Sequence, residues 1–123
     1  MHIVNMNRVE KSTLDGSHGA LTQFQRILGR GTTTPDLMRS FTGVSRITVP
    51  PGESNNPHLH ESEEQIYIVL RGRGLAEVGD EIHDAKAGDV IYLPPGVKHG
   101  FHNNSAITTV ILNIGSMIQP ERE

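Results

Sequence analysis

Three histidines in two short stretches of the chain could hold a metal ion. His58 and His60 stand in the segment Asn56-Pro-His-Leu-His60, and His99 follows the turn Pro94-Pro-Gly96. On an extended strand, side chains two residues apart point to the same face, so His58 and His60 can converge on one ion. Three imidazoles with one amide or carboxylate make a ligand set that suits a first-row transition metal.

The composition limits which other groups could take part. The chain has 123 residues and no cysteine, so a metal must be held by His, Asp, Glu or Gln, and disulfides are excluded. The formal charge of −3 arises from 14 acidic and 11 basic residues, which gives no reason to expect nucleic acid or an anionic membrane as partner. We expect a small-molecule partner instead.

The elements that must position the histidines are short strands. Thirteen glycines and seven prolines divide the chain into brief apolar runs. These runs predict strands over residues 21–28, 44–49, 65–70, 75–78, 81–83, 90–93 and 106–114. Strands broken about every eight to twelve residues by Gly and Pro indicate an antiparallel sandwich or barrel with little helix.

We predict one domain, as suits a chain of this length. It has an N-terminal arm over residues 1–40, a barrel over 41–118 and a polar tail over 119–123. The first residues lack the continuous apolar core of a signal peptide, and no stretch reaches the roughly 20 apolar residues of a membrane span. We therefore expect a cytoplasmic protein with no membrane partner.

One strand also indicates which side chains accompany the histidines. In residues 65–70, period-two alternation places Gln65, Tyr67 and Val69 on one face and the even-numbered residues from Glu64 on the other. Tyr67 is our candidate catalytic residue, since it could donate a hydrogen bond or a proton to a bound substrate. The alternative is a core aromatic residue with a satisfied hydroxyl.

Two longer patterns resemble the two motifs of the cupin superfamily (RmlC-like cupins). The second motif, Gly, five residues, Pro-x-Gly, two residues, His, three residues, Asn, is matched by Gly88, Pro94, Gly96, His99 and Asn103. The first motif, Gly, five residues, His-x-His, three or four residues, Glu, six residues, Gly, is matched by Gly52, His58, His60 and Gly72. Counted back from Gly72, its Glu position falls on Gln65, and Glu64 takes it only if the strand carries one extra residue.

The resemblance implies an all-β, cupin-type jelly-roll β-barrel, an antiparallel double sheet. It also implies one divalent transition metal, held by His58, His60, His99 and Gln65. Such ligands suit Mn, Fe, Co, Ni, Cu or Zn, and the sequence does not choose among them. Because Gln65 is neutral, the ion would keep its full charge and favour an anionic, chelating substrate such as an enediolate or α-hydroxy acid.

Three functions remain open from the sequence. The favoured one is a small enzyme whose metal acts as a Lewis acid in a non-oxidative isomerisation, elimination or cyclisation. The alternatives are a quercetinase-like dioxygenase and a non-catalytic, metal-dependent small-molecule binding protein. Small cupins commonly dimerise, so the resemblance also implies a homodimer.

Other polar residues have weaker claims. Arg46 could anchor a substrate carboxylate, although a solvated arginine is the simpler interpretation. Glu63, in an acidic loop, could hydrogen-bond to a ligand histidine. Strand alternation points His102 away from the third histidine and toward the surface. His18 is a candidate for the barrel mouth, and Phe101 is expected to line the cavity as an apolar wall.

Overall fold

The chain folds almost wholly as strands, and the computed structural model describes residues 1–13, 21–29, 31–32 and 37–118. The strands are β1 (Gln23–Gly29), β2 (Phe41–Val49), β3 (Ser54–His58), β4 (Glu63–Arg71), β5 (Arg73–Val78), β6 (Glu81–Lys86), β7 (Val90–Leu93), β8 (His99–His102) and β9 (Thr109–Met117). A three-residue 3₁₀ turn, Met6–Arg8, precedes them. Within the described ranges, no helix has the length and apolar character needed to cross a membrane.

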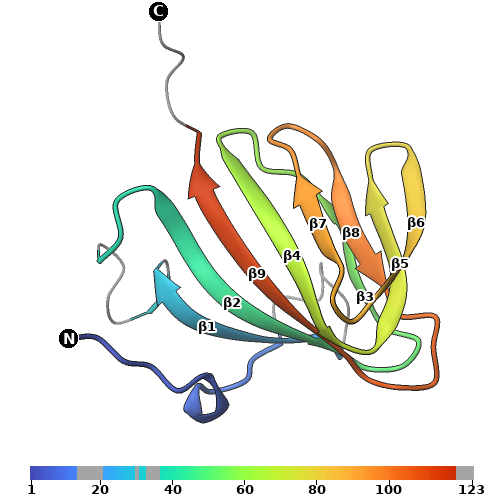
Figure 1. Cartoon of the computed structure of the whole chain (residues 1–123), viewed down its shortest axis with the longest axis horizontal. Helices are drawn as coiled ribbons and strands as arrows, with labels where there is room; N and C mark the ends of the chain where they lie inside the picture. The colour runs from blue at the N-terminus through green and yellow to red at the C-terminus, as the bar shows by residue number, and fades with distance from the viewer. Residues whose placement is uncertain (14–20, 30, 33–36, 119–123) are drawn as a thin grey trace, which may run out of the picture.

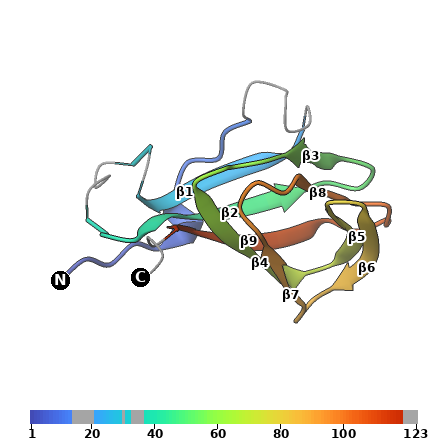
Figure 2. The same ribbon diagram turned by 90° about the horizontal axis from the view of Figure 1, so that it is seen from above.

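The strands form two antiparallel sheets that pack into a sandwich (Figure 1). One sheet has the order β1-β2-β9-β4-β7 and the other the order β3-β8-β5-β6. Seen from above, β5 and β6 lie at the end of the sandwich far from the N-terminus (Figure 2). The predicted all-β jelly-roll architecture is confirmed.

The last strand differs from its prediction. It was expected over residues 106–114 but runs from Thr109 to Met117. The side chain of Asn103 explains the late start, because its amide nitrogen donates to the carbonyl oxygen of Ile107 at 2.7 Å and its oxygen accepts from the backbone N–H of Ser105 at 3.0 Å. Asn103 thus folds residues 103–107 into a turn that the apolar pattern alone does not reveal.

The N-terminal segment is held on the outer face of the larger sheet by buried polar groups. Gln25 donates from its amide nitrogen to the carbonyl oxygens of Met6 and Val9, at 2.9 and 2.7 Å. Arg46 donates in turn to the amide oxygen of Gln25 at 2.7 Å and to the carbonyl oxygen of Met6 at 3.2 Å. Arg46 therefore fastens this segment, and the hypothesis that it anchors a substrate is wrong.

The inner face of the larger sheet has an apolar row at its closed end. Phe24 pairs with Ile47, Ile47 with Ile111, and Ile111 with Val69, so the row crosses β1, β2, β9 and β4. All four side chains are buried. Phe101 of the opposite sheet is also part of this core and does not line the cavity described below. The core thus closes one end of the sandwich and leaves the other end open to polar side chains.

Candidate metal centre

The three predicted histidines converge between the two sheets. Nitrogen atoms of His58, His60 and His99, one from each ring, all lie within 4.8 Å of one another. The ring centroids of His58 and His99 are 4.4 Å apart, and those of His58 and His60 are 5.2 Å apart. This spacing is close enough for one ion to be shared by all three rings after small rotations.

Pairing of β3 with β8 brings two of the histidines together. His58 and His99 are direct partners in the ladder, next to a β-bulge that lies between Asn55 and His58. Gly100 makes this approach possible, since a Cβ atom there would lie 2.9 Å from both the backbone carbonyl oxygen of Asn55 and the backbone nitrogen of Pro57. A larger residue at position 100 would therefore push apart the two strands that carry the site.

His60 is positioned by a turn and not, as expected, by an extended strand. It lies two residues beyond the end of β3, and its carbonyl oxygen accepts a hydrogen bond from the Gly96 backbone N–H at 2.8 Å. Gly96 has a φ of +70°, a left-handed conformation that glycine adopts without strain. The Pro94-Pro-Gly96 turn of the second motif therefore supports a histidine of the first motif.

Hydrogen bonds orient two of the imidazoles. The Nδ1 atom of His58 lies 2.8 Å from the carbonyl oxygen of Asn56, which can only accept, so Nδ1 carries the proton and Nε2 keeps its lone pair. The Nδ1 atom of His60 lies 3.5 Å from Oε1 of Glu63, and Oε2 of Glu63 accepts from the Thr42 hydroxyl. Such carboxylate–histidine contacts fix the ring and raise its basicity as a ligand.

The structure places Gln65, and not Glu64, on the side of the histidines. Gln65 is 9% exposed and lines the cavity, and its amide oxygen is buried and accepts no hydrogen bond from the described residues. Glu64 faces outward, where it accepts from the Tyr92 hydroxyl at 3.0 Å. The register of β4 does shift between Val69 and Arg71, but this irregularity follows Gln65 and leaves its parity unchanged.

The residues present fit a cation. A buried oxygen without a donor is uncommon in folded proteins, and a metal ion would satisfy that of Gln65. Three imidazoles and one amide oxygen are acceptors that a transition metal takes readily.

Tyr67 is buried beside this group. Its side chain is 1% exposed, and its ring centroid lies 5.9 Å from that of His99. The phenol oxygen accepts a hydrogen bond from the Asn55 amide nitrogen at 2.7 Å. Burial raises the pKa of Tyr67 far above its usual value, and the Asn55 hydrogen bond opposes this only in part. The phenol therefore stays protonated at neutral pH and can act as a donor, not as a base.

A cavity of about 290 Å³ opens in front of these groups. A cavity of this volume suits a small ligand. Four polar side chains of the larger sheet that the sequence reasoning missed also line it: Arg26, Thr42, Ser45 and Asn113. Asn113 carried a usable signal, since it interrupts the apolar run of residues 110–114 at an inward parity.

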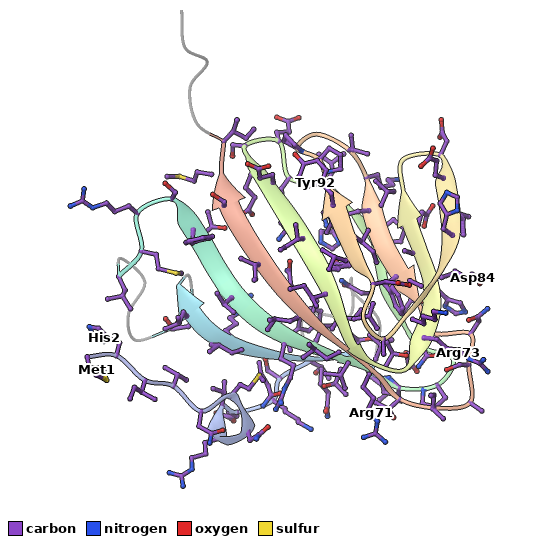
Figure 3. All side chains as sticks on the ribbon, viewed as in Figure 1. Met1, His2, Arg71, Arg73, Asp84 and Tyr92 are labelled. Atoms are coloured by element: carbon purple, nitrogen blue, oxygen red, sulfur yellow. The ribbon has the colours of Figure 1, made fainter. Side chains whose placement is uncertain are left out.

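The other histidines in the part of the chain that the structure describes do not join the cluster. His102 is exposed, as predicted, with its Nδ1 atom 2.6 Å from the Ser54 hydroxyl. His83 is exposed and lies 3.9 Å from Glu81, and His2 is exposed near the N-terminus (Figure 3). His18 lies outside the described residues.

Comparison with known families agrees with the fold and the histidine cluster. A family model described as the cupin domain matches residues 45–115, more than half of the chain. The protein therefore belongs to the cupin family.

The curated relatives that match first each cover only part of this chain. The oxalate-binding protein of Thermotoga maritima is 37% identical over 59 residues, which are 48% of this chain and 49% of that protein. The chain spans about half to just under two thirds of the length of the curated relatives that match first.

Two solved structures share the fold. The crystal structure of a predicted oxalate decarboxylase from Thermotoga maritima superimposes with a TM-score of 0.84 at 22% identity, covering 95% of this chain and all of that one. The polyketide cyclase RemF from Streptomyces resistomycificus gives a TM-score of 0.78 at 24% identity, covering 98% of this chain and 82% of that one. At these identities the two structures establish the fold alone.

Proposed function

We propose that the protein binds one divalent transition metal through His58, His60, His99 and Gln65 and acts as a small, non-oxidative enzyme on a chelating, oxygenated molecule. The observation that carries the proposal is the neutral donor set. Three imidazoles and an amide bring no negative charge, and the Glu64 carboxylate that could have done so faces outward. A site of this kind favours an anionic ligand.

The chain's own residues have separate parts in this proposal. When bound, the metal supplies Lewis-acid chemistry toward a ligand oxygen. A phenol is protonated at neutral pH and burial raises the pKa of Tyr67 further, so its hydroxyl can donate to an oxygen that gains negative charge. Glu63 and Thr42 hold the ring of His60, and the Asn56 carbonyl holds that of His58.

The two alternative functions differ in their support. A relative is described as an oxalate-binding protein, which supports the non-catalytic, metal-dependent binding protein as a second candidate. The quercetinase-like dioxygenase has no specific support in the cavity, whose walls near the histidines are polar and whose volume is small. A cytoplasmic location stays a prediction.

The metal content of purified protein tests the site. We expect close to one equivalent of a divalent transition metal in the wild type, measured by elemental analysis after dialysis. His60→Ala, at a half-exposed position, should lose most of it while retaining the wild-type circular dichroism spectrum. His99→Ala should do the same, and His83→Ala, an exposed histidine outside the cluster, is the control. A wild type that cannot be loaded with Mn²⁺, Zn²⁺, Ni²⁺ or Fe²⁺ would contradict the proposal.

Turnover separates the three functions. Loaded protein is incubated with a panel of α-hydroxy acids, α-keto acids and diketones, with and without oxygen, and the products are followed by NMR. The proposal requires equal conversion in both atmospheres, lost in His60→Ala. Conversion with oxygen uptake alone would indicate the dioxygenase, and binding without conversion would indicate the binding protein.

The contact between Glu63 and His60 gives a second prediction. Glu63→Gln removes the negative charge that orients the imidazole, so we expect metal affinity to fall about tenfold or more in a competition titration with a chelator. Glu64→Gln is the matched control, since Glu64 is the neighbouring residue and its carboxylate lies on the outer face. Equal losses in both variants would show that the effect is one of general charge and not of position.

We also propose a homodimer that forms through an outer patch of the larger sheet. Ile66, Ile68, Leu70, Val90 and Tyr92 face outward on β4 and β7, and the last three are 43%, 62% and 52% exposed. These residues are therefore not part of the inter-sheet core. Burying such a patch against a second copy would remove apolar surface from water.

Light scattering coupled to gel filtration tests the homodimer. We expect the wild type to have twice the mass of one chain. Val90→Lys should reduce it to a single chain because it places a charge in the outer patch, whereas Ile107→Lys, at an exposed residue outside the patch, should not. A monomeric wild type at tens of micromolar would contradict the dimer.

A further inference from the structure

A row of polar side chains crosses the inner face of the larger sheet, one layer above the apolar row. Arg26 pairs with Ser45, Ser45 with Asn113, and Asn113 with Tyr67, so the row runs from β1 through β2 and β9 to β4. All four residues line the cavity that holds the histidine cluster. We call these four residues the polar row.

The polar row and its neighbours offer more acceptors than the protein itself uses. Among the described residues, the amide oxygens of Asn55 and Asn113 are buried and accept no hydrogen bond. Asn55 is 1% exposed and its amide nitrogen is already engaged with Tyr67. Buried acceptors of this kind are costly unless a donor reaches them. A ligand with hydroxyl groups would supply the donors, whereas oxalate or a diketone would not.

Each end of the polar row could hold an anionic group. Tyr67 lies beside Gln65 and the histidines, where a divalent ion with neutral ligands would hold a chelating, anionic group. Arg26 lies at the other end. Its side chain already interacts within the protein, but a guanidinium carries several N–H donors and can pair with a second anionic group as well. The backbones of Arg26 and Tyr67 are three strand spacings apart, about 14 Å, and the side chains at both ends shorten the span. A linear ligand of about six carbons therefore matches the row.

We infer that the cavity takes a hydroxylated dicarboxylate, chelated at one end by the metal and held at the other by Arg26, with its hydroxyls on Asn113 and Asn55. This inference rests on the proposed metal site and adds the substrate class to it. The second charge and the hydroxyls are recognised by different parts of the chain. Each can therefore be tested by itself.

Three six-carbon probes separate these parts. Glucarate has two carboxylates and four hydroxyls, gluconate lacks the second carboxylate, and adipate lacks the hydroxyls. Isothermal titration of the zinc-loaded protein, with metal content measured in every sample, should rank glucarate first by about fivefold or more. Adipate binding as tightly as glucarate would overturn the role of the hydroxyls, and gluconate doing so would overturn that of the second charge.

Variants assign the contacts. Arg26→Gln should lower glucarate affinity about fivefold and leave gluconate affinity unchanged, because only the former has a second carboxylate. Asn113→Ala should weaken glucarate about tenfold and leave adipate unchanged. Arg71→Gln is the control, since this arginine is exposed and does not line the cavity (labelled in Figure 3).

The possible failures are distinguishable. Unchanged glucarate affinity in Arg26→Gln, or no binding of any probe to protein that carries its metal, would overturn this inference and leave the metal site intact. Protein that takes up no zinc would instead overturn the proposed function on which the inference depends. Equal losses in Arg26→Gln and Arg71→Gln would show a general charge effect and would also contradict the assigned contact.

Discussion

The site depends on how closely β3 and β8 can approach. His58 and His99 come from segments 41 positions apart in the numbering, and they face each other only because the two strands pair at these residues. Gly100 permits the approach, since no side-chain atom separates β8 from the bulged backbone of β3. The Pro94-Pro-Gly96 turn then supports the backbone of His60. The glycines and prolines of the two motifs therefore act on geometry, and the histidines supply the chemistry.

Along the inner face of the larger sheet, the side chains change from apolar in the core to polar at the cavity. The apolar row of Phe24, Ile47, Ile111 and Val69 closes the core, and the polar row lies directly above it. The same four strands form both rows, so the packing of the apolar row also fixes the strand register of the polar row. Polar groups that would destabilise a core are thus held toward the cavity, where a ligand can reach them.

Much of this could be predicted from the sequence, for physical reasons that apply to particular residues. The spacing of His58, His60 and His99 within two motifs fixed which histidines meet, and period-two alternation placed Gln65 and Tyr67 inward. Whether Gln65 binds a metal stays a prediction. The direction of the Arg46 side chain could not be predicted, since both faces of its strand carry apolar residues. Only its contact with Gln25 shows which way it points.

The polar row was beyond sequence reasoning. Arg26, Ser45, Asn113 and Tyr67 lie on four strands far apart along the chain, and their alignment depends on three pairing registers at once. A shift of one residue in any of them would turn a side chain to the outer face. Tyr67 was predicted to face inward, and among the other three residues only Asn113 had a local signal, as a polar residue within an apolar strand.

X-ray absorption spectroscopy of the metal-loaded protein tests the central claim most directly, because it counts imidazole ligands whatever the substrate proves to be. The account predicts three imidazoles with additional oxygen ligands in the wild type and two imidazoles in His60→Ala. A spectrum with fewer than three imidazoles in the wild type, or one that His60→Ala leaves unchanged, would contradict it.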